Sequence, residues 1–106
     1  GLIELSQMAK VIKRIVIEIP KEIDWILRVD GHTDKTKFLN GGKFKDNWEL
    51  SQARALSVVK YFIINENLPA KRFAATGFGE FQPIDTDESE IALARNRRIE
   101  IKLTER

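Results

Sequence analysis

The chain has 106 residues, the length of one domain, and its 18 basic and 16 acidic residues give a formal net charge of +2. This balance argues against a nucleic-acid surface defined by charge alone, and the lack of cysteine excludes disulfides and thiolate metal sites. No apolar run approaches the roughly 20 residues that cross a bilayer, and no signal peptide is visible. We interpret residues 1–106 as a single domain, excised from a longer protein whose targeting or anchoring segment lies upstream.

The first half of the chain predicts a helix and then a strand. Apolar side chains recur at three- and four-residue spacing over residues 4–19, as on one face of an amphipathic helix, and Pro20 ends it. Residues 24–30 then alternate between apolar and polar side chains, which is a strand pattern. The polar segment 31–46 follows, and ordered loops of this length are often functional.

The second half predicts another helix and two short strands. Residues 48–65 carry an apolar helical face, and Asn47 is placed as its N-cap. A short strand follows over 73–76 and ends at a glycine-rich turn. One helical turn over 91–95 precedes a last alternating strand over 98–103.

The predicted element order, α-β-α-β-β, indicates an α/β (α+β) two-layer sandwich. The first two strands flank a helix, so they should be parallel in a βαβ unit. The last strand follows a short connection and can pair antiparallel. We therefore expect a small mixed sheet with both long helices on one face.

Polar residues gather where the first predicted strand ends, which is where ligands of open α/β folds bind. Asp34 closes this cluster, and Asn47, Ser51 and Arg54 share one face of the next helix. A guanidinium can donate two parallel hydrogen bonds to a carboxylate, and a helix start attracts anions. Asp34 and Arg54 facing each other across a pocket would suit a zwitterion, with the ammonium on the aspartate and the carboxylate on the arginine. The alternative is that the two side chains pair with each other or with solvent.

Two other chemistries are open to the same cluster. His32 with Asp30 and Asp34 could hold a metal ion, but a single histidine without cysteine favours a structural role. A hydrolase using His32 and Asp34 would need a nucleophile. Thr33 and Ser51 carry hydroxyls, yet no nucleophile-elbow motif surrounds them.

A cluster of arginines near the end of the chain raises a third alternative, nucleic-acid binding. It comprises Arg95, Arg97 and Arg98. The chain just before it carries four acids: Asp85, Asp87, Glu88 and Glu90. Charged residues commonly flank an edge strand, and acidic residues this close to the arginines argue against the binding of a polyanion such as nucleic acid.

Four ordered motifs give the chain a family resemblance. They are Val29-Asp30-Gly31-His32-Thr33-Asp34, Asn47-Trp48-Glu49-Leu50-Ser51-Gln52-Ala53-Arg54-Ala55, Gly77-Phe78-Gly79-Glu80 with Pro83, and Asn96-Arg97-Arg98-Ile99-Glu100-Ile101. With this order and spacing, the chain resembles the OmpA C-terminal-like (OmpA/MotB) peptidoglycan-binding family. The segment 47–51 and the long loop after Asp34 resemble its MotB-like branch most.

The resemblance implies a periplasmic domain of a membrane-anchored envelope protein that binds peptidoglycan without catalysis, metal or cofactor. The ligand would be the diaminopimelate of the stem peptide, with its amino group on Asp34 and its carboxylate on Arg54. A stator role like that of MotB is compatible with the resemblance but does not follow from it. The remaining pocket positions implied are Asn47, one of Arg97 and Arg98, and the walls Thr33, Leu50 and Ser51.

One departure from the family concerns the sheet. Domains of this family begin with a strand before the first helix, and the chain has no room for that strand. An edge of the sheet would then stay open, and an open edge invites pairing with another chain. We therefore expect dimerisation or strand exchange.

Overall fold

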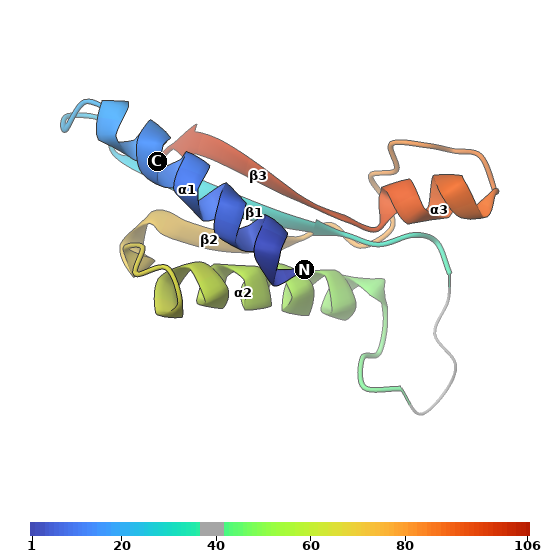
Figure 1. Cartoon of the computed structure of the whole chain (residues 1–106). Coiled ribbons are helices and arrows are strands. Elements are labelled where there is room, and N and C mark those ends of the chain that lie inside the picture. Colours follow the sequence, from blue (N-terminus) through green and yellow to red (C-terminus); the bar gives the residue numbers. More distant parts are fainter. Residues whose placement is uncertain (37–41) are drawn as a thin grey trace.

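The structure, a computed structural model, describes residues 1–36 and 42–106. Helices and strands follow one another in the predicted order (Figure 1). The elements are α1 (Leu2–Glu18), β1 (Trp25–His32), α2 (Asn47–Ile64), a 3-10 turn (Ala70–Arg72), β2 (Phe73–Gly77), α3 (Glu90–Asn96) and β3 (Arg98–Glu105). The α/β fold class and the α-β-α-β-β order are confirmed, and the helical turn expected over 91–95 is the short helix α3.

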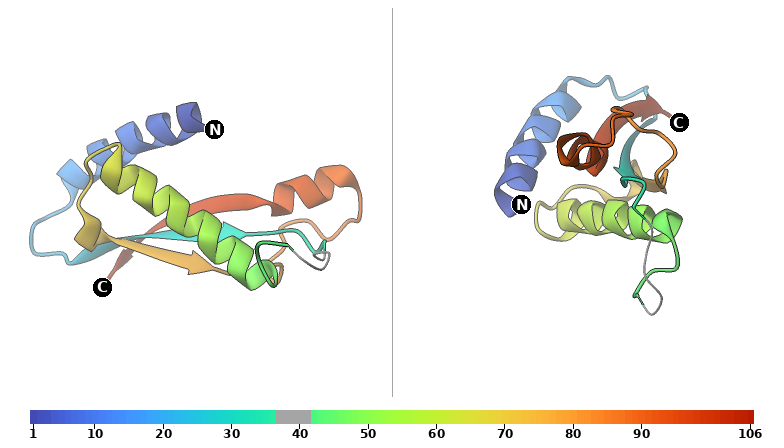
Figure 2. Two further views of the ribbon diagram at one scale, coloured as in Figure 1. Left: turned by 90° about the horizontal axis from the view of Figure 1, so that it is seen from below. Right: turned by 90° about the vertical axis from the view of Figure 1, so that its right-hand side faces the viewer.

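The described strands form one mixed sheet in the order β2-β1-β3. β1 pairs in parallel with β2, with Gly31 opposite Gly77, and antiparallel with β3, with Gly31 opposite Ile99. Figure 2 shows α1 and α2 on the same face of this sheet, as expected for two layers. The carboxyl end of β1, the amino end of α2 and the whole of α3 lie together at one end of the molecule (Figure 1).

The core lies between the two long helices and the central strand. Its buried side chains are Ala9 and Ile12 of α1, Trp25, Leu27 and Val29 of β1, Ala55, Val58, Val59 and Phe62 of α2, and Leu68. Each large apolar side chain contributes roughly 1.5–3 kcal/mol when fully buried. The alternation of β1 and the helical periodicity of α2 therefore hold the end of β1 against the start of α2.

Bare backbone lets α2 approach the sheet closely at that end. A Cβ atom on Gly31 would lie 2.2 Å from the carbonyl oxygen of Ser51. One on Gly77 would lie 2.6 Å from the amide nitrogen of Gln52. Because these two paired positions have no side chain, the helix backbone lies closer to the sheet here than a side chain would allow.

Two of the differences between expected and observed boundaries bear on the site. β1 continues through Gly31 and His32, because both residues pair with the start of β3. The N-cap of α2 is Asp46 rather than Asn47, and Asp46 Oδ1 accepts a 2.9 Å hydrogen bond from the amide of Glu49. Asp and Asn are equivalent caps, so two adjacent candidates left the choice open.

β3 has a neighbour on one side only in the described sheet. Leu103 near its end is 48% exposed although it faces the helices. Met8, Val11 and Ile15 of α1 are also exposed, and they line an apolar groove of about 300 Å³ with Leu103.

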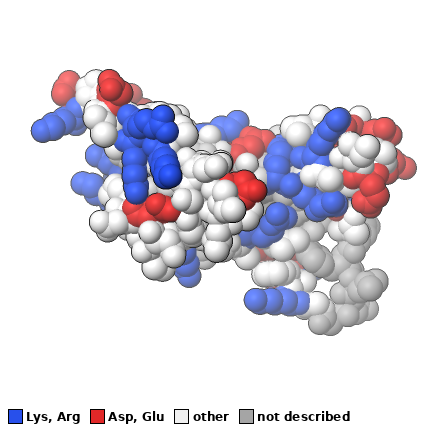
Figure 3. Space-filling view, viewed as in Figure 1, with Lys and Arg blue, Asp and Glu red and all other residues white. Residues whose placement is uncertain are grey.

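Basic and acidic side chains are interspersed over the surface seen in Figure 3, with no continuous basic face. None of the described helices is both long and apolar enough to span a bilayer.

Candidate functional site

Asp34 lies two residues beyond β1, and its side chain is only 9% exposed. Its Oδ1 accepts a 2.7 Å hydrogen bond from the amide of Thr36, and its Oδ2 lies 2.5 Å from Arg97 Nη1. The Thr33 hydroxyl donates to the carbonyl oxygen of Asp34 at 2.9 Å. The carboxylate is therefore held in one orientation from both of its oxygens.

Asp34 stays ionised in spite of its burial. Burial by itself would raise its pKa, but the hydrogen bonds from Thr36 and the ion pair with Arg97 outweigh it. The pKa of Asp34 therefore lies below its ordinary value. A shielded carboxylate that keeps its charge is a suitable partner for an ammonium group.

Asn47, the first residue of α2, ties the helix to the loop that carries Asp34. Its side-chain amide donates to the carbonyl oxygens of Asp34 (3.3 Å) and Thr36 (3.2 Å), and to Glu80 Oε1 (3.2 Å). Three chain segments thus meet at one buried amide. This contact positions the loop and accounts for asparagine at this place after the cap.

Arg54 lies seven residues, or about two turns, after Asn47 on the same flank of α2. Side chains of a helix lean toward its amino end, so Arg54 leans toward the end where Asp34 lies. Within residues 1–36 and 42–106, its guanidinium makes no hydrogen bond or ion pair of its own, and Arg97 is the arginine bonded to Asp34.

Ser51 belongs to the frame of the site, and Leu50 precedes it on α2. Ser51 is completely buried, and its Oγ accepts the amide hydrogen of Gly79 at 2.9 Å and donates to the carbonyl oxygen of Trp48 at 3.1 Å. Leu50 is half-buried. The Ser51 hydroxyl is fully used in joining α2 to the turn after β2.

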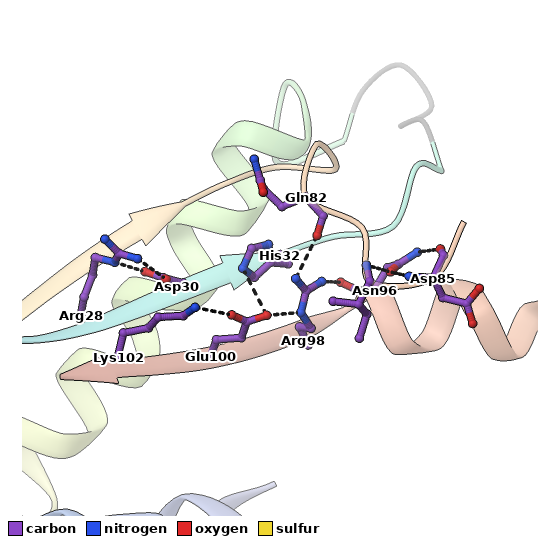
Figure 4. A network of polar contacts seen from close by, with 10 residues as sticks. Arg28, Asp30, His32, Gln82, Asp85, Asn96, Arg98, Glu100 and Lys102 are labelled. Atoms are coloured by element: carbon purple, nitrogen blue, oxygen red, sulfur yellow. Dashed lines mark hydrogen bonds and ion pairs between the residues drawn. The ribbon is translucent and has the colours of Figure 1, made fainter. Parts of the chain in front are cut away.

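The two consecutive arginines point to different places. Arg97 reaches Asp34, whereas Arg98 bonds Glu100 through Nε (2.5 Å) and the carbonyl oxygen of Gln82 through Nη2 (2.9 Å). Figure 4 shows Arg98 in a polar network across β1 and β3, on the opposite side of the sheet from α2. Of the pair, Arg97 is the one at Asp34.

His32 belongs to that network. Its Nε2 lies 3.9 Å from Glu100, its ring stacks on Phe78 with centroids 5.1 Å apart, and its buried Nδ1 has no partner among the described residues. Burial, and then the nearby Arg98, lower the pKa of His32, so the ring is neutral at pH 7.

The acids nearest His32 are already paired with cations. Asp30, His32 and Glu100 have potential ligand atoms within 4.8 Å of one another. Arg28 donates to both oxygens of Asp30, and Arg98 and Lys102 pair with Glu100. A metal ion would have to displace these side chains. Asp34 does not belong to this group.

A hollow of about 190 Å³ opens beside the Asp34 loop, between the segment after β2 and α3. Lys35, Glu80, Asp85, Asp87 and Asn96 are among its lining residues. Asn96 anchors it, because its Oδ1 accepts the amides of Ile84 and Asp85 while its amide donates to the carbonyl oxygen of Asp85.

Glu80 and Asn96 fall inside two of the four ordered motifs of the sequence, yet neither of them was predicted to have a role in the site. Their motif positions were the only available signal.

Comparison with known proteins places this geometry in a family. The OmpA family model matches residues 3–97, so the chain belongs to the OmpA family. It is 40% identical over 83 residues to the uncharacterized protein YtxE and 35% identical over 92 residues to motility protein B, both of Bacillus subtilis. These matches cover 78% and 87% of the chain but only 32% and 33% of the relatives, so the chain spans about a third of their length.

A further relative is the peptidoglycan-associated lipoprotein of Pseudomonas aeruginosa, with 31% identity over 70% of the chain and 40% of the lipoprotein. Several solved structures with a similar fold are MotB-like. A MotB-like protein from Desulfovibrio vulgaris has a TM-score of 0.78 and 31% identity, covering 93% of this chain and 56% of that one. The periplasmic domain of Helicobacter pylori MotB has 0.79 and 27%, covering 97% and 60%. The cell wall anchor of the T6SS from Pseudomonas aeruginosa has 0.74 and 30%, covering 95% and 63%.

Proposed function

We propose that this domain binds peptidoglycan non-covalently through the diaminopimelate of the stem peptide and so anchors an envelope protein to the cell wall. The observation that carries this function is the buried, ionised Asp34, which pairs with Arg97 near the amino end of α2. An amino-acid head group carries an ammonium and a carboxylate a few ångströms apart. Asp34 would take the ammonium, and Arg54, assisted by Arg97, would take the carboxylate.

The names of the relatives support this ligand. One is a peptidoglycan-associated lipoprotein and another structure is a cell wall anchor. The H. pylori match is a periplasmic domain, which supports a position in the cell envelope. Membership of a flagellar stator is one such role, supported by the MotB likeness.

Binding of the stem peptide is tested by calorimetric titration with L-Ala-γ-D-Glu-meso-diaminopimelate, using the lysine-containing tripeptide as the ligand control. The lysine-containing tripeptide lacks the second carboxylate of diaminopimelate, so it should bind more weakly. Asp34→Asn and Arg54→Gln should each weaken binding about 10- to 100-fold, since each removes a charged hydrogen bond worth roughly 1.5–3 kcal/mol.

Exposed residues far from the site provide matched controls. Glu18→Gln and Arg14→Gln make the same charge changes on α1 and should leave binding unchanged. Wild-type protein that gives no heat with the diaminopimelate peptide, or binds it as well after either site substitution, would refute the proposal.

A hydrolase using His32 and Asp34 is disfavoured by the hydroxyl groups near them. Thr33 donates its hydroxyl to a backbone carbonyl, and Ser51 is buried with its hydroxyl bonded on both sides. We expect no release of labelled fragments from purified peptidoglycan, with wild type and His32→Gln giving the same background.

A second copy of the chain is the partner proposed for the free edge of β3. Arg98, Glu100 and Lys102 alternate with apolar residues along this strand. In an antiparallel pair of β3 strands centred on Ile101, Glu100 of each copy lies beside Lys102 of the other. Shifting this register by two residues would put Glu100 beside Glu100 or Lys102 beside Lys102, which is unfavourable.

A further inference from the structure

The amino end of α2 carries an exposed aromatic pair that the stem-peptide site does not use. Trp48 and Phe81 stack with ring centroids 5.0 Å apart and an interplanar angle of 29°. They remain 51% and 57% exposed, although each is large enough to be a core residue. Trp25, by contrast, is 8% exposed.

The pair is built by the fold from two distant segments. Trp48 comes from the first turn of α2, and Phe81 comes from the segment after β2. Gly79 lies beneath both rings with φ +64°, and a Cβ atom there would lie 3.3 Å from Phe81 and 3.4 Å from Trp48. The absent side chain lets the rings rest on the backbone, so the pair has a fixed position.

The aromatic pair is continuous with the Asp34 site. Trp48 and Phe81 directly follow Asn47 and Glu80, whose side chains contact each other at 3.2 Å. Asn47 also donates to the loop that holds Asp34. Trp48 and Arg54 are six positions apart and leave α2 about 120° apart around its axis, on either side of the buried Ser51. The contact between Asn47 and Glu80 is therefore what joins the aromatic pair to the Asp34 site.

The surroundings of Trp48 are those of a shallow binding surface. A hollow of about 570 Å³ adjoins it, lined among others by Phe44, Glu49 and Gln52. Glu49 and Gln52 provide one carboxylate and one amide at its rim. This mixture of aromatic rings, an acid and an amide suits an uncharged polar ring, whose C–H faces pack on aromatic rings while its hydroxyl and acetamido groups bond to the rim.

We infer that Trp48 and Phe81 form a stacking site for an N-acetylated amino sugar of the glycan strand, next to the stem-peptide site. This rests on the proposed function, because in peptidoglycan the peptide stem is covalently joined to the sugar. Once the peptide is held at Asp34, the sugar is present at high effective concentration, so a weak stacking contact adds to the affinity.

The test compares three probes on the intact chain: the free tripeptide, the disaccharide-tripeptide, and chitotriose, which is glycan without peptide. The disaccharide-tripeptide should bind roughly 2- to 10-fold more tightly than the tripeptide, the size of one aromatic stacking contact. Trp48→Ala and Phe81→Ala should each abolish that difference and leave tripeptide affinity unchanged. Ile64→Ala, which truncates another exposed apolar side chain of α2, should change neither affinity.

A spectroscopic readout keeps the test independent of variant stability. The indole N–H signal of Trp48 in a ¹H–¹⁵N spectrum, assigned by its loss in Trp48→Phe, should move with disaccharide-tripeptide and with chitotriose. The signal of Trp25 should stay in place.

The outcomes separate the two hypotheses. Equal affinities for tripeptide and disaccharide-tripeptide, with the Trp48 signal unmoved, would overturn the sugar site and leave the peptide site standing. A response to chitotriose without tripeptide binding would support the sugar site and refute the proposed peptide function. A Trp48 shift with a single-stranded oligonucleotide, but not with chitotriose, would overturn the sugar assignment.

Discussion

Asp34 and Arg97 show how a single ion pair can prepare a binding group. Asp34 is buried enough that its charge would be unfavourable without partners, and Arg97 is exposed enough to move aside. A ligand ammonium could replace or join the guanidinium without leaving the carboxylate unpaired. The exposure of Arg97 keeps the contribution of this pair to stability small, so its main effect is on the charge state of Asp34.

We predict that Arg97→Ala raises the pKa of Asp34 toward or above its ordinary value, because burial then acts against fewer compensating contacts. The carboxyl ¹³C shift of Asp34, followed through an acid titration, measures this change. Arg98→Ala is the matched control and should move the pKa of Glu100, which Arg98 holds down, but not that of Asp34. An Asp34 titration identical in wild type and Arg97→Ala would contradict the assignment of Arg97 to this site.

His32 makes a separate prediction about pH. Its pKa is lowered in the folded state, so the unfolded chain binds the proton more readily. The stabilisation is therefore complete above the unfolded pKa, about 6.5, and is lost as pH falls through the lower folded pKa. Urea titration at pH 7.5 and at a pH below 6.5 measures how much the free energy of unfolding falls on acidification. This fall should be larger in wild type than in His32→Asn. Equal losses would place the acid sensitivity elsewhere.

At the scale of elements, the binding end depends on how α2 meets the turn after β2. Ser51 holds the amide of Gly79, and the two glycines of the sheet let the helix backbone come close. Asn47 and the Asp46 cap complete the attachment. Most of these contacts join main chain to short polar side chains, so substitutions here act on hydrogen bonds more than on apolar packing.

Ser51→Ala should lower the free energy of unfolding by about 1–3 kcal/mol, since the buried amide of Gly79 loses its acceptor. Ser57→Ala is the same change on an exposed turn of the same helix, where the hydroxyl only bonds the carbonyl oxygen of Arg54. It should stay within about 0.5 kcal/mol of wild type. Denaturant titration of both variants checks this, and similar losses would argue against a special role for Ser51.

Periodicity predicted the elements because an element buried on one face repeats an apolar residue once per turn in a helix and at every second position in a strand. It placed the ends less well, since Gly31 and His32 join β1 through pairing with a strand far along the chain. Alternation along β3 also places Arg98 and Glu100 on one face, which separates Arg98 from the Asp34 site. The contacts of Glu80 and Asn96 depend on the path of the loop between them, for which no periodic signal exists.

For the whole molecule, the open side of β3 is the feature with the widest effect. The adjoining groove leaves apolar surface of α1 and β3 in solvent. Pairing with a second copy would give the backbone groups at the edge of β3 hydrogen-bond partners, and the same contact would cover the apolar side chains of the groove.

Light scattering at high concentration should report a dimer, and Lys102→Glu should favour the monomer by placing like charges together. Glu100→Lys should do the same. Mixing the two variants should restore a dimer, because each lysine then lies beside a glutamate of the other chain. Monomers at every concentration, or homodimers of both variants, would rule out pairing in this register.

The spacing between α2 and the sheet differs at its two ends. Near Gly31 and Gly77 the backbone of α2 lies directly against the backbone of the sheet. Farther along, the stacked rings of Phe62 and Phe73, whose centroids are 5.8 Å apart, separate the helix from the sheet. Phe62 is fully buried, so replacing it should lower the melting temperature through lost packing while the glycine contacts near the start of α2 stay in place. Substitutions around Phe62 and Phe73 should therefore reduce stability before they reduce ligand recognition, whereas a side chain added at either glycine would displace the end of the helix that carries the site.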